Sequence, residues 1–589
     1  MKKLLGLLLT AFAIFAVIAC EELTTTATTA ATTASTTATT ASPTSTSTTT
    51  GTTTETTTEP TTQMTTTTEE VPAYTVKTVE FINFSTEFID DTPMTALDLY
   101  FYPEKAGIPY VDISEFIELL RGIIDETIQV EIDPVNLTVN VFVEYFLTEE
   151  EKIEYGTEED SIVEYCLFNF ASTTVSAPNI DSFDYFTGET ETDFSAGLNL
   201  VSYTEEELPA FHVDLTPYLF TFKILSIDGD TDRFTIPLHL ADLFLTGSMF
   251  DVVNNGDYLY GIDTYQLGDV DDETSPLHAA AALNDDETPA MKTESENYLA
   301  FVFDYFYGLK DYKSIDSFID YVDTYFSRLT AFEKSLYKFT DSLADLHTGI
   351  ISVGHTNPTY DYYATTDYPD YIYDYSYEYY GCGCNTVTEP FLLEFYEDLA
   401  YYRIDGFTSD FKTDIEADME AIRAADPEYV IIDLSCNGGG VLAGVFHLLN
   451  YLTNADISFY TVTLGARSSA TYDVEGDLAI DAEFFIITSA ATYSAANLFT
   501  ALAVENNLAR TIGSQSGGGA CSVKAIVLPN GAIMQMSSNM NLAYSTYETV
   551  EEGVAPNYSI DWGRNYTDRI PYPTLAEFLA IIEGMPPAA

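Results

Sequence analysis

Short apolar runs alternate with segments of helical pattern in the last third of the chain. The β-branched and aromatic runs at 429–434 and 484–488 have the length of buried strands, and residues 411–425 and 494–505 have helical patterns. Further elements are expected as strands at 401–407, 459–462, 524–527 and 533–535 and as a helix at 441–452. This alternation predicts a layered α/β domain over residues 390–589.

A purely helical pattern precedes this domain. Between residues 294 and 346 the apolar side chains recur at the spacing of helix faces, and the third of three predicted helices carries Leu336, Phe339 and Leu343 on one face. We therefore expect a short helical bundle over residues 290–355.

Residues 74–270 are acidic and have strand-like patterns. Two stretches of this region, 108–142 and 234–262, resemble distant copies of one unit, each with a predicted strand, a short helix and a second strand. A mixed α+β repeat region of this kind suits substrate binding or spacing better than chemistry. We expect His212 and His239, which lie in it, to be structural.

The first 20 residues indicate export. Lys2 and Lys3 precede an apolar run from Leu4 to Ile18, and the run ends in Ala19-Cys20, which is the order of a secretory signal. The ending resembles a bacterial lipoprotein signal, which implies acylation of Cys20 and anchoring in the lipid bilayer at the outer face of the cytoplasmic membrane or the cell surface. An ordinary signal or a single membrane anchor is the alternative, and it also places the rest of the chain outside the cytoplasm.

Two low-complexity segments separate the patterned regions. Residues 21–72 are mostly Thr with Ala and Ser, and they predict a disordered stalk because they cannot bury enough apolar surface to offset their ordering entropy. Residues 356–388 are rich in Tyr and Asp and predict a surface insertion.

Composition narrows the choice of partners. The 589 residues include 22 Lys and Arg against 93 Asp and Glu, so the formal net charge is −71. Such a surface repels nucleic acids and attracts cationic peptides, or simply keeps the protein soluble. The five cysteines beyond Cys20 are too few and too scattered for a disulfide framework, and we expect them to be structural or incidental. The sequence contains no nucleotide-binding loop or metal-ligand pattern, so we expect no cofactor and no metal.

Two strand-to-helix junctions carry candidate chemistry. The glycine triplet 438–440 follows the predicted strand at 429–434, and its amides can face a ligand without interference from side chains. Ser494 follows the strand at 484–488 and begins a helix, where the Ala495 amide can donate to the same anion. The alternatives are an ordinary turn for the triplet and a helix cap for Ser494.

His347 closes the predicted bundle in the motif Leu-Ala-Asp-Leu-His-Thr (343–348). A serine needs a base to become a nucleophile, and histidine is the usual base near neutral pH. The chain has only 6 histidines. The alternative is a structural histidine.

Taken in order, these motifs resemble the C-terminal-processing and tricorn-type serine peptidases over residues 295–562. The matched motifs are Leu-Ala-Asp-Leu-His-Thr (343–348), Tyr-Arg-Ile-Asp-Gly-Phe (402–407), Asp-Leu-Ser-Cys-Asn-Gly-Gly-Gly (433–440), Thr-Tyr-Ser-Ala-Ala-Asn (492–497), Ile-Gly-Ser-Gln-Ser-Gly-Gly-Gly (512–519), Leu-Pro-Asn-Gly (528–531) and Glu-Gly-Val-Ala-Pro-Asn (552–557). The resemblance implies an α/β fold with a crotonase-like (ClpP/crotonase) spiral core of ββα units.

The resemblance also assigns roles to residues. It implies that Ser494 is the nucleophile, that His347 is the base and that Glu551 or Glu552 orients the histidine. The amides of Gly438, Gly439 and Ala495 would then form the oxyanion hole.

The chain departs from the family pattern at two positions, of which the missing lysine places it in a tricorn-like branch, and the sequence shows no PDZ-like segment. The processing-protease branch has a lysine 25 residues after the nucleophile, where this chain has Gly519, and Lys524 lies five residues further on. Leu346 stands beside His347, where the family often has a small or polar residue.

The expected function is that of a serine-type peptidase that hydrolyses peptide bonds of extracytoplasmic proteins or peptides, cationic ones included, through an acyl-enzyme. Two alternatives stay open. One is an inactive peptidase-fold lipoprotein that binds peptides or other ligands, and the other is an adhesive surface lipoprotein that acts through its acidic, Tyr-rich segment.

Overall fold

The computed structural model describes the chain between residues 73 and 586, with gaps. The described residues are 73–85, 94–148, 152, 160–186, 199–227, 231–247, 250–263, 287–327, 331–353, 384, 391–408, 411–473, 478–562 and 572–586. The predicted signal and stalk, and all of the predicted insertion except Cys384, lie outside these residues. Within them, no helix has the length and apolar character needed to span a bilayer.

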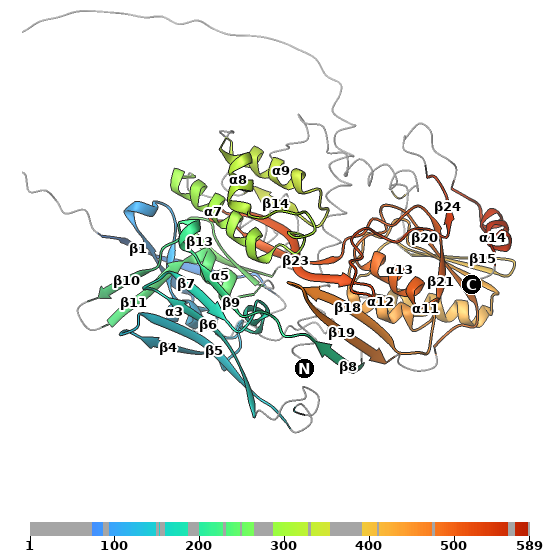
Figure 1. The fold of residues 1–589 in the computed structure, drawn as a ribbon, viewed down its shortest axis with the longest axis horizontal. Helices are drawn as coiled ribbons and strands as arrows, with labels where there is room; N and C mark the ends of the chain where they lie inside the picture. The colour runs from blue at the N-terminus through green and yellow to red at the C-terminus, as the bar shows by residue number, and fades with distance from the viewer. Residues whose placement is uncertain are drawn as a thin grey trace, which may run out of the picture.

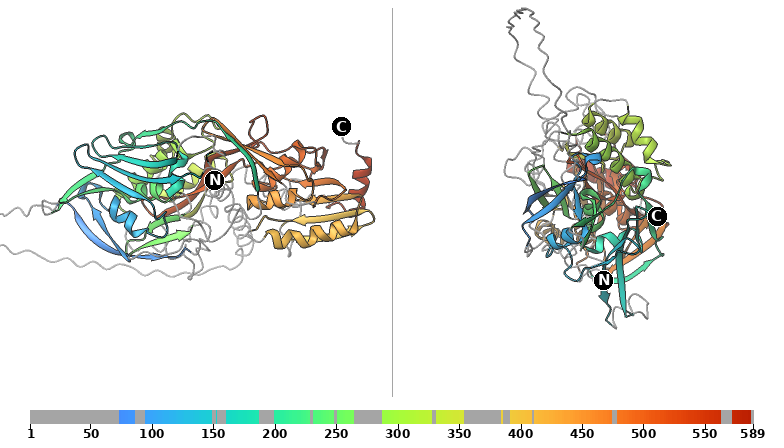
Figure 2. Two further views of the ribbon diagram at one scale, coloured as in Figure 1. Left: turned by 90° about the horizontal axis from the view of Figure 1, so that it is seen from below. Right: turned by 90° about the vertical axis from the view of Figure 1, so that its left-hand side faces the viewer.

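The molecule is elongated and has two bodies, which Figures 1 and 2 show at opposite ends of its long axis. The N-terminal body contains two sheets. One has the strand order β10 (Lys223–Ile227), β11 (Thr231–Pro237), β3 (Tyr110–Asp112), β2 (Ala96–Phe101), β1 (Thr75–Asn83), β13 (Tyr258–Asp263) and β12 (Phe250–Asn254). The other has the order β4 (Gln129–Asp133), β5 (Thr138–Phe146), β6 (Ser161–Asn169), β7 (Thr174–Ala177) and β9 (Phe211–Asp214).

The two stretches that resemble copies of one unit share an element order. In the first, β3 is followed by helix α3 (Ile113–Leu119) and the hairpin β4–β5; in the second, β11 is followed by α5 (Leu238–Leu245) and the hairpin β12–β13. Each stretch therefore ends in two strands, and the expectation of one strand was wrong. The two hairpins lie in different sheets, although β3 and β11 pair with each other antiparallel. A common origin of the stretches stays a prediction.

Three helices form the predicted bundle beside the N-terminal body. They are α7 (Pro289–Phe306), α8 (Phe318–Phe326) and α9 (Phe332–Leu343). Side chains cap the first two, because the Thr288 hydroxyl accepts from the Met291 amide at 3.1 Å and the Ser317 hydroxyl from the Ile319 amide at 3.2 Å. Their apolar faces join the core of the N-terminal body, and short 3-10 turns at Pro103–Lys105, Asp181–Phe186 and Thr216–Tyr218 complete that body.

A third sheet connects the two bodies. Its strands are β14 (Gly349–Val353), β23 (Ala532–Ala543), β18 (Ile457–Thr463), β19 (Ala466–Asp473) and β8 (Asn199–Glu205), and β22 (Cys521–Val527) also pairs with β23. The long strand β23 runs from one body into the other (Figure 1). Strand β8 comes from the N-terminal region but pairs with β19, so strand pairing crosses the predicted domain boundary.

The α/β body is built on a fourth, mostly parallel sheet. Its order is β15 (Phe391–Tyr396), β16 (Leu399–Ile404), β17 (Tyr429–Asp433), β20 (Glu483–Thr488), β21 (Ala509–Gly513) and β24 (Tyr558–Ser559). Alternate strand residues pack on opposite faces. One face packs against α11 (Phe411–Ala425), α12 (Leu442–Leu449) and α13 (Ala495–Glu505), and the other packs against α14 (Leu575–Gly584).

The predicted α/β alternation is confirmed for this body. The predicted strands at 429–434 and 484–488 correspond to β17 and β20, and the helix at 411–425 has the predicted bounds. The hydrophobic pattern did not indicate β15, β19, β21, β24 or α14. The mixed α/β character of the fold is therefore established, whereas a crotonase-like spiral stays a prediction.

Candidate active site

The candidate site begins where two neighbouring parallel strands end. Strands β17 and β20 pair in register, with Asp433 beside Ile487. The glycine loop 434–440 leaves β17, and the segment that leads to Ser494 leaves β20, so both loops start from the same edge of the sheet. The carboxyl ends of parallel strands are the usual place for ligands in α/β folds.

Ser494 has an unusual backbone conformation. Its φ is 54° and its ψ is −124°, although it is not a glycine, and it lies immediately before α13. Its side chain makes no capping hydrogen bond, so the helix-cap interpretation is wrong in this structure. A strained, half-buried residue at a strand-to-helix turn with an uncommitted hydroxyl is typical of a nucleophile.

Hydrogen bonds hold the segment before Ser494 against the glycine loop. The Tyr493 amide donates to Asn437 O at 3.1 Å, the Thr492 hydroxyl to Leu434 O at 2.7 Å and the Ser494 amide to Gly518 O at 2.9 Å. Because these donors and acceptors are backbone or fully buried groups, the position of Ser494 relative to the loop is fixed.

The glycine loop presents fewer free amides than expected. The Gly439 amide donates to Asn437 Oδ1 at 2.8 Å and is therefore already engaged. Gly438 and Ala495 have no amide hydrogen bond to another described residue, and Ala495 is the first residue of α13, where helix amides lack intrahelical partners. Gly440 has a φ of 127°, and a Cβ there would lie 2.1 Å from Phe407 O, so only glycine fits.

Asn437 and Cys436 are features of this loop that sequence analysis did not assign. The Asn437 side chain is fully buried, and its Nδ2 has no hydrogen-bond partner among the described residues. Its Oδ1 accepts from the Gly439 backbone amide, and this hydrogen bond distinguishes the oxygen of the Asn437 side-chain amide from the nitrogen. Cys436 forms a disulfide with Cys384 across a separation of 52 residues, so two of the cysteines are paired. Nothing in the cysteine spacing indicates that pair.

His347 lies in the turn between α9 and β14. Its side chain is 2% exposed, and its backbone amide donates to Asp345 Oδ1 at 3.0 Å. Burial lowers the pKa of the imidazole to about 4, with Asp345 opposing the shift. The ring is therefore neutral near pH 7, which is the form that a general base requires.

The structure packs His347 against Tyr493 but does not join the side chains of His347 and Ser494. The His347 ring packs edge-on against the ring of Tyr493, the residue before Ser494, with 4.7 Å between ring centroids. No hydrogen bond links the imidazole to the Ser494 hydroxyl among the described residues, and His347 Nδ1 has no partner there. Apo sites often make such contacts only when substrate binds.

Asp345 is the carboxylate whose negative charge acts on the His347 imidazole and raises its pKa against the effect of burial. Its Oδ2 accepts from Tyr307 at 3.2 Å and from the Thr348 hydroxyl at 2.6 Å, and its burial is nearly complete. The residue lies within the quoted motif at 343–348, but sequence analysis gave it no role. Its position two residues before His347 was the only signal for it.

Glu551 and Glu552 differ sharply in their surroundings. The Glu551 carboxylate accepts from the Ala520 amide at 2.7 Å. Burial, followed by repulsion from Asp345, raises the pKa of Glu551 to about 7, with the Ala520 amide and Lys313 opposing. Glu552 is exposed and accepts from the Tyr312 hydroxyl. Of the two, only Glu551 lies within electrostatic range of Asp345 and Tyr493.

The two lysine-related positions make no alternative base. A Cβ on Gly519 would lie 2.6 Å from Cζ of Tyr493, so the Tyr493 ring occupies the space beside that position. Lys524 points away from the site, because its Nζ lies 5.2 Å from the Phe306 ring centroid and 3.8 Å from Asp184 Oδ1 in the N-terminal body.

The raised pKa of Glu551 makes stability depend on pH. Glu551 keeps its proton up to about pH 7 in the folded state, but an unfolded glutamate loses it near pH 4.3. The contribution of protonated Glu551 to the free energy of unfolding is therefore fully present below about pH 4.3 and is lost as pH rises through 7. We expect the free energy of unfolding of Glu551→Gln, measured in urea, to rise relative to that of the wild type by about 1–3 kcal/mol between pH 4 and pH 8.

Glu552→Gln is the matched control for this measurement. It removes the same charge one residue away at an exposed position. Because repulsion from Glu552 is the smallest of the causes of the raised pKa of Glu551, the difference between this variant and the wild type should change much less between the two pH values. An equal pH dependence in wild type and Glu551→Gln would contradict the burial argument.

No group of three or more His, Cys, Asp or Glu side chains is arranged to hold a metal ion within the described part of the chain. The absence of a cofactor stays a prediction.

Comparisons with known proteins agree with the motif resemblance. Residues 398–560 match the family model described as "Peptidase family S41". A carboxyl-terminal-processing protease from Picosynechococcus sp. is 24% identical over 153 residues, which cover 26% of this chain and 35% of that protein. The chain thus spans about a third of the length of this relative.

Solved structures show a more distant likeness. A candidate peptidase from Parabacteroides merdae is 19% identical with a TM-score of 0.36, covering 46% of this chain and 89% of that one. The tricorn protease is 10% identical with a TM-score of 0.32, covering 79% of this chain and 46% of that one. These low scores support no conclusion about activity. The family resemblance therefore depends on the matched segment: residues 398–560, which contain Ser494 and the glycine loop, match the model of peptidase family S41.

Proposed function

We propose that this chain is a serine-type peptidase that hydrolyses peptide bonds of extracytoplasmic proteins or peptides. The observation that carries the proposal is Ser494 itself. It has a positive φ at a strand-to-helix junction, and its hydroxyl is not used as a helix cap. A structural serine gains nothing from such a conformation, whereas a nucleophile gains access to its substrate.

In the proposed mechanism, Ser494 attacks the scissile carbonyl and His347 accepts its proton. Burial keeps the imidazole neutral before the reaction, because it lowers the pKa of His347 to about 4. The imidazolium that forms needs a nearby negative charge. Asp345 and Glu551 are candidates for this role, and Glu552, which is exposed and bound to Tyr312, is the weaker choice.

The amides of Ala495 and Gly438 are the proposed oxyanion donors. Both lack partners among the described residues, and the N-terminus of α13 adds positive dipole character beside Ser494. Gly439 can contribute only if its bond to Asn437 opens, and that opening would free the Asn437 side chain as well. One such donor is worth about 10²–10³ in rate.

Labelling with a fluorophosphonate probe tests this function. The probe should react with the full ectodomain, and peptide mapping should find the adduct on Ser494. In a structure of the adduct, the phosphonyl oxygen should face the amides of Ala495 and Gly438. Absence of labelling, or an adduct on another serine, would contradict the proposal.

A second candidate function is a ligand-binding protein on an inactive peptidase fold. The unmade contact between Ser494 and His347 favours it, as does the occupation of the space beside Gly519 by Tyr493. A protein of this kind would bind peptides at the same site without reacting with the probe, so the labelling experiment separates the two functions.

Export and lipid anchoring through Cys20 complete the proposal. Both depend on the first 20 residues, which lie outside the described part of the chain. Cys20→Ser should move the protein from the membrane fraction to the soluble fraction after cell breakage. Unchanged membrane association would contradict acylation at this residue.

A further inference from the structure

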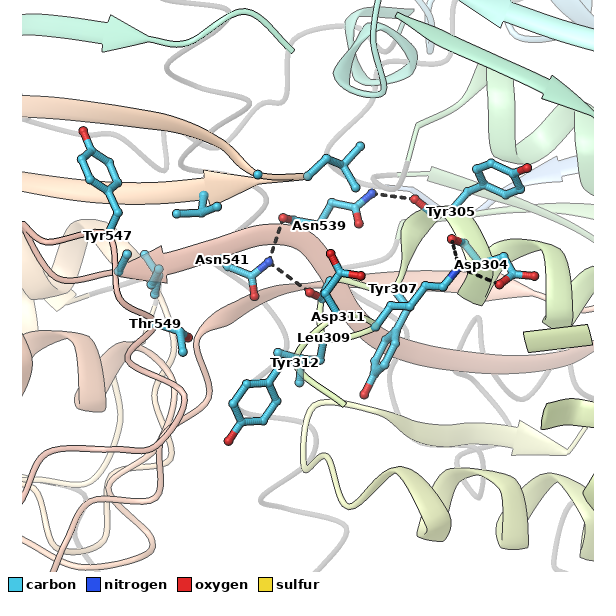
Figure 3. A pocket seen from close by; sticks show the side chains of 17 residues that line it. Asp304, Tyr305, Tyr307, Leu309, Asp311, Tyr312, Asn539, Asn541, Tyr547 and Thr549 are labelled. Atoms are coloured by element: carbon cyan, nitrogen blue, oxygen red, sulfur yellow. Dashed lines mark hydrogen bonds and ion pairs between the residues drawn. The ribbon is translucent and has the colours of Figure 1, made fainter. Parts of the chain in front are cut away.

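A pocket of about 480 Å³ lies between the helical bundle and the sheet that connects the two bodies (Figure 3). The loop after α7 forms one wall, and the ends of β18 and β23 form the other. The volume is within the range of small-molecule and side-chain binding sites. Neither the family match nor the proposed catalytic groups assign a role to this pocket.

The pocket adjoins the proposed catalytic groups. Tyr307 lines it and donates its hydroxyl hydrogen to Asp345 Oδ2, two residues from His347. Thr549 also lines it, and its hydroxyl accepts from the Glu551 amide at 3.1 Å. A peptide bound across Ser494 could therefore place a side chain in this pocket.

The ammonium group and the side-chain amides of the pocket already donate hydrogen bonds within the protein. Lys310 Nζ donates to Asp304 Oδ1 at 2.8 Å and to Asp304 O at 3.1 Å, which neutralises it. Asn541 Nδ2 donates to Asn539 O and Gly308 O, and Asn539 Nδ2 donates to Tyr305 O. An anionic ligand would find no free donor among these amides and this ammonium group.

Two side-chain acceptors of the lining are not used. The Asp311 carboxylate is exposed and has no hydrogen bond or ion pair with another described residue, and neither has Asn539 Oδ1. Figure 3 shows Asp311 among the side chains that line the pocket. The charges of Asp304 and Lys310 cancel in their ion pair, so Asp311 gives the pocket lining a net charge of one negative unit.

Apolar side chains complete the lining. Leu309, Leu542, Val462 and Leu464 contribute carbon surface to the same walls. A long aliphatic stem with a cationic tip matches this combination, since lysine and arginine bury their stems on apolar surface and keep the charged group beside an acceptor. The formal net charge of −71 also raises the local concentration of basic peptides.

We propose that this pocket is a specificity subsite that binds a Lys or Arg side chain of the peptide substrate, with Asp311 as its counter-ion. The proposal rests on the proposed peptidase function only in that the ligand is a peptide held across Ser494. Two cationic side chains lie near the pocket, Lys313 over the Tyr312 ring and Arg467 over the Tyr547 ring. They limit the preference for basic peptides because they repel a second cationic side chain.

The test measures binding, so that it does not depend on turnover. The full ectodomain carrying Ser494→Ala is panned against random decapeptides, and a retained Lys-containing peptide is compared with its norleucine analogue by fluorescence anisotropy. We expect the lysine peptide to bind about two- to fivefold more tightly, as a solvent-accessible ion pair predicts. Adding Asp311→Asn should remove the difference, and Asp311→Lys should favour a glutamate peptide.

Asp316→Asn is the matched control, because it removes a charge from an exposed position on the same loop outside the pocket. It should keep the preference for lysine. Equal binding of lysine and norleucine peptides, an unchanged preference in Asp311→Asn, or no retained peptide at all would overturn the proposal. If lysine peptides bind through Asp311 but the unmutated ectodomain does not cleave them, the peptidase function fails and the subsite stands.

Discussion

Replacement of Ser494 by alanine is expected to lower peptide cleavage by at least about 10⁴-fold and to abolish fluorophosphonate labelling. The variant loses the only atom that can form the acyl bond, while the amides around it stay in place. Its fold should be unchanged, because the Ser494 side chain makes no hydrogen bond with another described residue. The measurement is cleavage of an unfolded protein and of a peptide library, together with the unfolding midpoint in urea.

Alanine also disfavours a positive φ, so a second variant separates strain from chemistry. Ser494→Gly tolerates the backbone conformation and should be at least as stable as the wild type, yet equally inactive. Retention of cleavage in either variant would exclude Ser494 as the nucleophile. A loss of stability in the alanine variant that the glycine variant restores would show that strain at this residue is real.

Replacement of His347 by glutamine is expected to lower kcat by about 10³–10⁴-fold with little change in KM. Glutamine keeps part of the side-chain volume beside Tyr493 but cannot accept a proton from Ser494. The wild type should lose activity on the acid side with a midpoint near pH 4, because burial holds the pKa of His347 at about 4. A separate limb near pH 7 would belong to Glu551 and should disappear in Glu551→Gln.

His212→Gln is the control for this variant. His212 lies on β9 in the N-terminal body, is exposed and shares a hydrogen bond of 2.8 Å with Ser176, so its loss should leave kcat unchanged. Full activity of His347→Gln, or an acid limb at the ordinary histidine pKa near 6.5, would contradict a buried general base at this position.

The parallel sheet of the α/β body could be predicted because its central strands are uniformly apolar. β17 and β20 are buried on both faces, and their neighbouring helices begin and end close to the predicted residues. The edge strand β15 was missed because most of its side chains are half-buried or exposed and its pattern is mixed. β24 has only two residues, too few for any pattern.

The candidate site was predictable as a set of residues but not as an arrangement. His347 reaches Tyr493 because β14, two residues further along, pairs with the first residues of β23, the strand that runs on into the α/β body. That pairing joins residues nearly 190 positions apart, and no local pattern contains it. The separation of Glu551 from Glu552 likewise depends on packing between distant segments, because Glu552 accepts from Tyr312. The engagement of Gly439 by Asn437 is a contact within one loop, but the residue types alone do not specify it.

The pairing of β8 with β19 limits how far the peptidase half can be treated as a unit of its own. Residues 199–205 cover the edge of β19 with an antiparallel ladder whose register shifts once, and Glu206 and Arg467 exchange further hydrogen bonds beyond it. A fragment that starts at the helical bundle would leave this edge bare, and bare edges invite strands of other molecules. Loss of the N-terminal half would thus cost the remaining half its protection against self-association, even though that half supplies none of the proposed catalytic side chains.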